Sequence, residues 1–342
     1  MKKIIALLLI AMFSIAVLGC SRQAAKSPAP EQTAKKNLAG TTLKAYAAYG
    51  PLDKIFAEFQ KETGIKVEFL DMSSGEVLSK LRAEKGKPTG DIWFGGGVDS
   101  FIAAQSDGLL EPYISPEAAK VPAQYKEKDG YWTGVSLAIV TFLVNKDRCK
   151  ELGIPVPESW ADLLNPKLKG EVVMSDPAVS GTAYFTLYGL IKDTAQGWPY
   201  MGKLNVNIPA YAKRGGEPPQ KAAIGEATVG ISPDTSEELK AQGYPAVTVF
   251  PKDGTPWWPS PVAILKGSQN PDGAKAFVDW CLSEKGQNIL KQYTPRVPAR
   301  EGIAYPAVVE GIKSAKMMNI DFIQAGNERD AILAQFQKIR GK

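Results

Sequence analysis

The chain has 342 residues, with 41 lysines and arginines against 36 aspartates and glutamates, and is 44% hydrophobic and 23% charged. These fractions are ordinary for a globular protein, and a net charge of +5 without a run of basic residues gives no reason to expect nucleic-acid binding. The chain has no histidine. This excludes the Ser-His-Asp and Cys-His arrangements of nucleophilic catalysis and removes the commonest ligand for zinc and copper.

The first twenty residues have the pattern of an export signal. Met1–Lys3 is positively charged, Ile4–Leu18 is uncharged and mostly apolar, and Gly19 precedes Cys20. This order is typical of a secretory signal peptide, and the alternative, a transmembrane helix, needs roughly 20 apolar residues. The segment ending at Cys20 resembles the lipobox of bacterial lipoproteins. It implies removal of residues 1–19 and a diacylated cysteine that ties the protein to the outer face of a lipid membrane.

The segment 20–40 is rich in Ala, Lys, Gln, Pro and Ser and has little apolar bulk, so we expect a flexible tether. The roughly 300 residues that follow are long for a single core. We predict two lobes, with residues 41–138 and 259–342 in lobe 1 and residues 139–258 in lobe 2. Cys149 and Cys281 then fall in different lobes, and we expect both to be free thiols.

Strand and helix patterns alternate at the start of the mature chain. The strands are expected at Leu43–Ala47, Ile65–Phe69 and Asp91–Phe94, because short β-rich runs end there at turn residues. Helices are expected after Pro51, after the capping box that begins at Ser73, and over Val98–Asp107. This βαβαβα order predicts a parallel sheet with helices on both faces.

The middle of the chain contains two candidate crossovers between the lobes. Trp132–Asn145 is too long for one ordinary strand, and Pro256–Leu265 is a candidate for the return. Between them we expect strands at Glu171–Met174, Ala227–Ile231 and Ala246–Phe250, and a helix that follows Ser180–Thr182. A last helix is expected over Glu328–Ile339.

Seven stretches, in order along the chain, carry a family resemblance: Phe59–Val67, Asp91–Gly97, Asp107–Tyr113, Pro157–Leu163, Asn165–Gly170, Ser175–Tyr184 and Ala276–Trp280. Together they resemble the extracellular solute-binding proteins of ABC importers, in the branch of ferric-iron, thiamine, hexose-phosphate and aminoethylphosphonate binders. The resemblance implies an α/β, type II periplasmic-binding fold: two lobes, each a mainly parallel sheet flanked by helices, joined by crossover strands. It also implies a monomer without enzyme activity or cofactor, a small ligand in the cleft, and a partner permease with its ATPase.

Four loops at strand ends are candidates for the ligand site, because helix N-termini attract anions and Ser, Thr and Gly let a ligand reach backbone N–H groups. In phosphate-ester and phosphonate binders of the family the matching Ser-Gly-Thr holds the anionic group, which favours the loop at Ser180–Thr182. Plain caps and tight turns are the alternatives. The candidates are Tyr49, Ser74, Gly96, Gly97, Asp99, Ser180, Gly181 and Thr182.

Four further residues are weaker candidates. Trp257 and Trp258 could stack on a sugar or an amine, or could pack between the lobes. Glu226 and Asp234 could accept hydrogen bonds from a ligand, or could be surface acids.

Ferric iron is the alternative ligand. Iron-binding relatives commonly use adjacent tyrosines and a histidine, whereas Tyr200 and Tyr211 stand alone here and histidine is absent. We therefore predict a receptor for a small anion, with a phosphate ester or phosphonate favoured. An extracytoplasmic hydrolase and a sensory or adhesive lipoprotein are the rival classes, although no G-x-S-x-G or dense metal-ligand cluster supports an enzyme.

Overall fold

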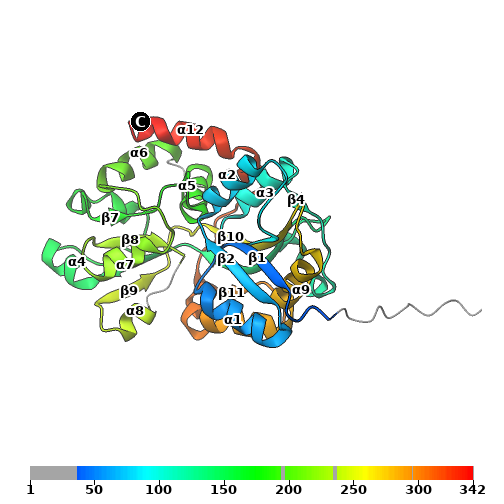
Figure 1. The fold of residues 1–342 in the computed structure, drawn as a ribbon. Helices are drawn as coiled ribbons and strands as arrows, with labels where there is room; N and C mark the ends of the chain where they lie inside the picture. Colours follow the sequence, from blue (N-terminus) through cyan, green and yellow to red (C-terminus); the bar gives the residue numbers. More distant parts are fainter. Residues whose placement is uncertain (1–36, 194–196, 234–236, 295, 342) are drawn as a thin grey trace, which may run out of the picture. The chain divides into compact units, whose positions relative to one another are not determined.

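The computed structural model describes residues 37–193, 197–233, 237–294 and 296–341. Residues Leu38–Lys342 form one compact unit of mixed α/β structure that contains two sheets (Figure 1). Within the described residues, the first sheet has the strand order β11-β5-β10-β3-β1-β2, and β4 also pairs with β10. Its strands are β1 (Thr42–Ala48), β2 (Lys66–Asp71), β3 (Ile92–Gly95), β4 (Leu110–Glu111), β5 (Thr133–Ile139), β10 (Trp257–Leu265) and β11 (Val297–Pro298).

The second sheet has the order β7-β8-β6-β9. Its strands are β6 (Thr141–Asn145), β7 (Val172–Val173), β8 (Val229–Ser232) and β9 (Ala246–Val249). The helices that accompany the two sheets are α1 (Leu52–Thr63), α2 (Ser74–Glu84), α3 (Val98–Ser106), α4 (Lys146–Leu152), α5 (Gly181–Asp193), α6 (Gly197–Asn207), α7 (Glu217–Ala223), α8 (Glu237–Ala241), α9 (Pro271–Leu282), α10 (Glu284–Tyr293), α11 (Phe322–Asn327) and α12 (Arg329–Ile339).

Alternation along β1 explains why helices cover both faces of the first sheet. Leu43, Ala45 and Ala47 belong to the same hydrophobic cluster as the buried side chains of α1 and α9. Tyr46 points to the opposite face and belongs to a cluster with buried residues of α2 and α3. The predicted βαβαβα arrangement is therefore confirmed for β1, β2 and β3, which pair in parallel.

The expectation of mainly parallel sheets is wrong in detail, because both sheets are mixed. β10 runs antiparallel to β3, β4 and β5, and β6 runs antiparallel to β8 and β9. The reason is that strands arriving through the crossovers enter each sheet without a right-handed helical connection of the kind that makes neighbours parallel. The sequence pattern of a buried strand is the same in parallel and antiparallel pairing, so the sequence did not reveal the direction.

The crossovers lie side by side. β5 and β6 are separated by Val140 and belong to different sheets, as the long apolar run predicted. The return differs from the expectation. Among the residues that the structure describes, β10 pairs only with strands of the first sheet, so the chain has already crossed before Trp257. The Val140 N–H donates to the Pro256 carbonyl at 2.9 Å, and the Thr255 hydroxyl donates to the Val140 carbonyl. The predicted lobe boundaries stay a prediction.

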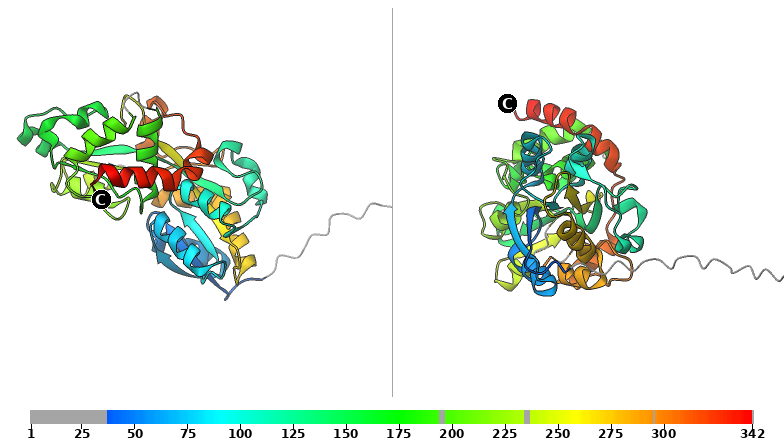
Figure 2. Two further views of the ribbon diagram at one scale, coloured as in Figure 1. Left: turned by 90° about the horizontal axis from the view of Figure 1, so that it is seen from above. Right: turned by 45° about the vertical axis from the view of Figure 1, so that its right-hand side comes forward.

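The C-terminal helices contact elements of both sheets. α11 packs against α3, and α12 runs beside α6 (Figures 1 and 2). Cys149 and Cys281 are free thiols, and both are buried. Burial raises the pKa of both thiols. No helix among the described residues is both long and apolar enough to cross a bilayer.

Candidate functional site

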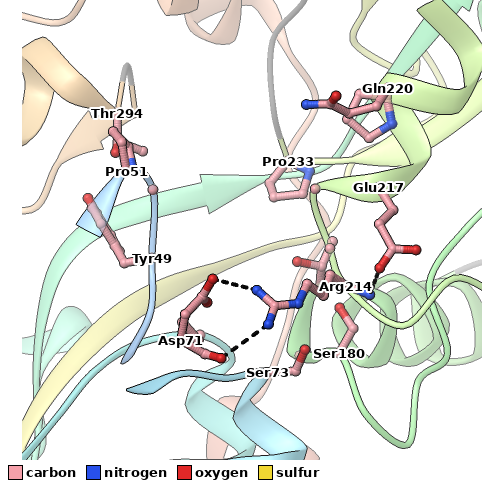
Figure 3. A pocket seen from close by; sticks show the side chains of 18 of the residues that line it. Tyr49, Pro51, Asp71, Ser73, Ser180, Arg214, Glu217, Gln220, Pro233 and Thr294 are labelled. Carbon is pink, nitrogen blue, oxygen red and sulfur yellow. Dashed lines mark hydrogen bonds and ion pairs between the residues drawn. The ribbon is translucent and has the colours of Figure 1, made fainter. Parts of the chain in front are cut away.

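A cavity of about 740 Å³ opens where loops that follow strands of the two sheets face each other. This volume lies within the usual range of ligand pockets. Figure 3 shows its lining, with Tyr49 and Asp71 on the side of the first sheet and Ser180 and Arg214 on the side of the second. Strand ends and helix starts supply most of the polar groups, which is the usual location of ligands in α/β folds.

Three helix N-termini meet at the hydroxyl of Ser74. Its Oγ accepts the N–H of Gly97, which precedes α3, at 3.2 Å and the N–H of Gly181, which begins α5, at 3.2 Å. Ser74 itself begins α2. A hydroxyl that accepts two bonds keeps its own proton for a third partner, and the three helix ends make the local potential positive. The arrangement suits an anion.

Glycines make this convergence sterically feasible. A Cβ atom on Gly181 would lie 2.5 Å from the backbone N of Gly97, and a Cβ on Gly75 would lie 2.4 Å from the Ala178 carbonyl oxygen. On the other side of the cavity, a Cβ on Gly215 would lie 2.8 Å from the Thr182 hydroxyl. The backbone thus approaches closely at Gly181 and Gly75, where loops from the two sheets meet, and at Gly215 within the side of the second sheet.

Arg214 brings a positive charge into the cavity on the side of the second sheet (Figure 3). Its guanidinium bonds to the carboxylate of Asp71 at 2.5 Å and to the Asp71 backbone carbonyl at 3.1 Å. Its backbone N–H donates to Glu217 at 3.0 Å. The ion pair joins the end of β2 to the loop before α7, so it connects the two sides of the cavity.

The opposite wall is formed by an aromatic ring and a second arginine. The Arg296 guanidinium lies 5.1 Å from the ring centre of Tyr49, and both residues line the cavity. The Tyr49 hydroxyl points away from it and donates to the Ser136 hydroxyl at 2.9 Å. Burial raises the pKa of Tyr49, and the nearby Arg296 opposes this rise.

Half of the predicted ligand residues line the cavity: Tyr49, Ser74, Gly96, Ser180, Gly181 and Thr182. Gly97 lies directly behind them, against Gly181. Glu226 is exposed, forms an ion pair with Lys221 at 2.7 Å and is not part of the lining. Asp234 and Cys20 lie outside the described residues.

Asp99 and the two tryptophans support the site from behind. Asp99 is fully buried and pairs with Arg329 at 2.8 Å. Burial raises its pKa, and the arginine opposes this rise. Trp258 donates to the Gly96 carbonyl at 3.1 Å and stacks on Phe185 of α5. Trp257 donates to the Met318 carbonyl at 2.9 Å. Neither tryptophan is part of the cavity lining, and a role for them in ligand binding stays a prediction.

Sequence reasoning missed both arginines of the cavity, together with Asp71. The Lys213–Gly216 segment combines two basic residues with two glycines, and this combination at a loop was the available signal. Arg296 gave no comparable signal, because it follows a helix and a proline rather than a strand.

Neither tyrosine considered for iron lines the cavity. The Tyr200 hydroxyl donates to the Trp160 carbonyl at 2.7 Å, and the Tyr211 hydroxyl donates to Asn205 at 2.7 Å. The described part of the chain also holds no group of three or more His, Cys, Asp or Glu residues placed to bind a metal ion.

Residues 88–323 match the family model of the bacterial extracellular solute-binding proteins. The chain belongs to this family. This solute-binding protein is similar to the periplasmic binding protein AfuA of Actinobacillus pleuropneumoniae, with 32% sequence identity. The structure of AfuA was solved with fructose 6-phosphate bound. The superposition has a TM-score of 0.83 and covers 88% of this chain and 98% of AfuA.

The chain is also similar to two curated proteins. An uncharacterized protein of Haemophilus influenzae is 38% identical over 240 residues, which are 68% of this chain and 69% of the relative. A probable ABC transporter periplasmic-binding protein of Sinorhizobium fredii is 27% identical, over 77% of this chain and 75% of the relative. The type II periplasmic-binding fold and an extracytoplasmic location follow from the family.

Proposed function

We propose that this solute-binding protein is the receptor of an ABC importer for a phosphorylated sugar or a similar small phosphate ester. It captures the solute in the cavity and delivers it to a membrane permease that is driven by an ATPase. The observation that carries the proposal is the start of α5 at Ser180–Thr182 beside Arg214, facing Ser74 from the first sheet. The resemblance to a protein solved with fructose 6-phosphate supports the same ligand class.

The side of the cavity formed by Ser180–Thr182 and Arg214 offers hydrogen-bond donors and a positive charge. A phosphate group has the acceptors and the negative charge that match them. The hydroxyls of Ser180 and Thr182 lie beside the backbone of Gly215, and the guanidinium of Arg214 lies nearby in the same lining. Hydrogen bonds to a charged group contribute about 1.5–3 kcal/mol each. Three such bonds would contribute roughly 5–9 kcal/mol, which is comparable to the roughly 4–15 kcal/mol that association costs. The positive end of α5 and contacts with the rest of the ligand would therefore supply the remaining affinity.

The remaining polar groups suit the hydroxyls of a sugar. Asp71 and Glu217 carry acceptors on the cavity wall, and Gln220 and Gln242 carry both donors and acceptors. The ring of Tyr49 gives an apolar surface on the opposite side. A phosphorylated sugar would contact both the phosphate-binding groups around Ser180–Thr182 and these hydroxyl-binding groups. Inorganic phosphate would contact only the former.

Ligand binding is proposed to hold the two sides of the cavity together. The close contacts of Gly181 with Gly97 and of Gly75 with Ala178 join loops from the two sides, and the paired crossovers at Val140 and Pro256 are suited to act as the hinge. The hydrogen bonds that the Ser74 hydroxyl accepts from Gly97 and Gly181 would be made in the closed form and broken in the open one.

The lipid anchor belongs to the same proposal. A diacylated Cys20 would keep the receptor beside its permease, on the periplasmic side of an inner membrane or on the surface of a cell with a single membrane. The segment 20–40 would act as the tether, and the receptor would work as a monomer.

Isothermal titration calorimetry of the purified chain without residues 1–20 tests the ligand class. Fructose 6-phosphate, fructose, inorganic phosphate, 2-aminoethylphosphonate and ferric citrate are titrated separately. We expect saturable binding of fructose 6-phosphate that is at least tenfold tighter than that of phosphate, and no binding of fructose. Binding of ferric ion alone would replace the ligand class with iron, and turnover of a bound phosphate ester would favour a hydrolase.

A further inference from the structure

The loop that leads into α5 is held by its own aspartate. The Asp176 carboxylate accepts the N–H of Ala178 at 2.9 Å, and the Asp176 carbonyl accepts the N–H groups of Val179 at 3.0 Å and Ser180 at 2.8 Å. These bonds determine the direction in which the Ser180 side chain and the first N–H groups of α5 enter the cavity. The position of Asp176 therefore controls how Ser180 and the start of α5 are placed in the cavity.

An arginine at the C-terminal end of α12 contacts Asp176. Arg340 bonds to the other carboxylate oxygen of Asp176 at 2.5 Å, and the two side chains are only 10% and 21% exposed. The guanidinium also lies 4.4 Å from the ring centre of Tyr211. Tyr211 stands three residues before Arg214, and the Asp176 N–H donates to the Ala212 carbonyl at 2.8 Å. Arg340 thus contacts both segments that carry the positive wall of the cavity.

A second arginine, at the N-terminal end of α12, contacts the same loop from the other side. Arg329 donates to the Ala178 carbonyl at 3.1 Å and to the Asp99 carboxylate at 2.8 Å. Its side chain is 8% exposed, and that of Asp99 is fully buried. Because Asp99 lies in the first turn of α3, this pair also connects the loop to the glycine turn before that helix.

We propose that α12 is a positioning element of the ligand site, with Arg340 and Arg329 as its positioning residues. They hold the loop at Asp176–Ser180 between them and do not touch the ligand themselves. Loss of Arg340 leaves a half-buried carboxylate without its cation, so Asp176 turns toward water and the Ser180 wall loses its alignment. The ligand readout of this inference rests on the proposed function.

The test compares Arg340→Met, Arg340→Lys and the matched control Arg300→Met. Arg300 makes a similar half-buried ion pair with Glu117 at 2.7 Å, and neither residue lines the cavity. The first readout is hydrogen exchange of the backbone amides of residues 178–182 without ligand. We expect at least tenfold faster exchange in Arg340→Met, partial recovery in Arg340→Lys, and wild-type exchange in Arg300→Met.

The second readout is the affinity for fructose 6-phosphate, measured by calorimetry at a temperature where all variants are folded. We expect a tenfold or greater loss in Arg340→Met, a smaller loss in Arg340→Lys, and an unchanged affinity in Arg300→Met. Wild-type exchange of the loop in Arg340→Met would overturn the inference, as would an equal loss of affinity in Arg300→Met. Absence of binding by the wild-type protein, with fast exchange in Arg340→Met, would overturn the ligand class and leave the positioning role supported.

Discussion

Thr182 is the residue at which a single hydroxyl can be tested without a change of shape. Its side chain lies at the start of α5, in the cavity lining, and its oxygen would be 2.8 Å from a Cβ on Gly215. Thr182→Val removes the hydroxyl and keeps the volume. Since a hydrogen bond to a charged group contributes about 1.5–3 kcal/mol, we expect the affinity for fructose 6-phosphate to fall roughly 10- to 150-fold in calorimetry.

The control for this variant is Thr63→Val, at the end of α1, whose hydroxyl bonds to the Phe59 carbonyl and which does not line the cavity. It should bind as the wild type does. An unchanged affinity in Thr182→Val would move the anion away from the start of α5.

Arg214 tests the charge of the same wall. Arg214→Met removes a planar donor that bonds to Asp71, and Arg214→Lys keeps the charge but not the two-pronged geometry. We expect a loss of affinity of roughly tenfold or more in the first variant and an intermediate loss in the second. Arg82→Met removes an exposed ion pair with Asp107 and should leave binding unchanged. Wild-type affinity in Arg214→Met would exclude a direct role for this guanidinium.

At the scale of elements, the contact between the start of α5 and the turn before α3 depends on two glycines. A Cβ on Gly181 would lie 2.5 Å from Gly97 and 2.7 Å from the Ser74 hydroxyl, which no side chain can occupy without movement. Alanine favours a helix more than glycine does, so Gly181→Ala should fold. We expect it to hinder closure, with weaker ligand binding and a smaller decrease in the radius of gyration on ligand addition in small-angle scattering.

Gly202→Ala is the matched control, because Gly202 lies within α6 and a Cβ there would meet nothing within 4 Å. It should close and bind as the wild type does. Full closure and full affinity in Gly181→Ala would show that the two helix starts do not need to meet for binding.

At the scale of the whole molecule, the anchor separates location from binding. Cys20→Ser removes the proposed acylation site, and two acyl chains contribute about 0.8 kcal/mol per buried CH₂, which is enough for stable attachment. We expect the variant to leave the membrane fraction of cells after a salt wash, while its affinity for the ligand stays unchanged. A variant that still sediments with membranes would contradict the lipoprotein prediction.

Local patterns were sufficient to predict the first three strands of the first sheet and the helices that follow them. The capping box at Ser73–Glu76 is present, and the strands at β1, β2 and β3 lie within two residues of their predicted bounds. Both features depend on hydrogen bonds and side-chain alternation between residues close in sequence. The mixed direction of the strands was not predictable in this way, because it depends on which strand lies beside which after the chain has crossed between sheets.

The residues of the candidate site also fall into those that local sequence predicted and those that only the tertiary structure revealed. Ser180–Thr182 and Ser74 were predicted because a small polar residue at the start of a helix has the same chemistry in any fold. Asp71, Arg214 and Arg296 were not, since an isolated charged residue is normally a solvated one and only the tertiary structure brings these three to one cavity. The environment of Asp99 was not predictable either, because its partner, Arg329, is 230 residues away along the chain. Asp99 is buried beside this cation and is not part of the cavity lining, and its role in ligand binding stays a prediction.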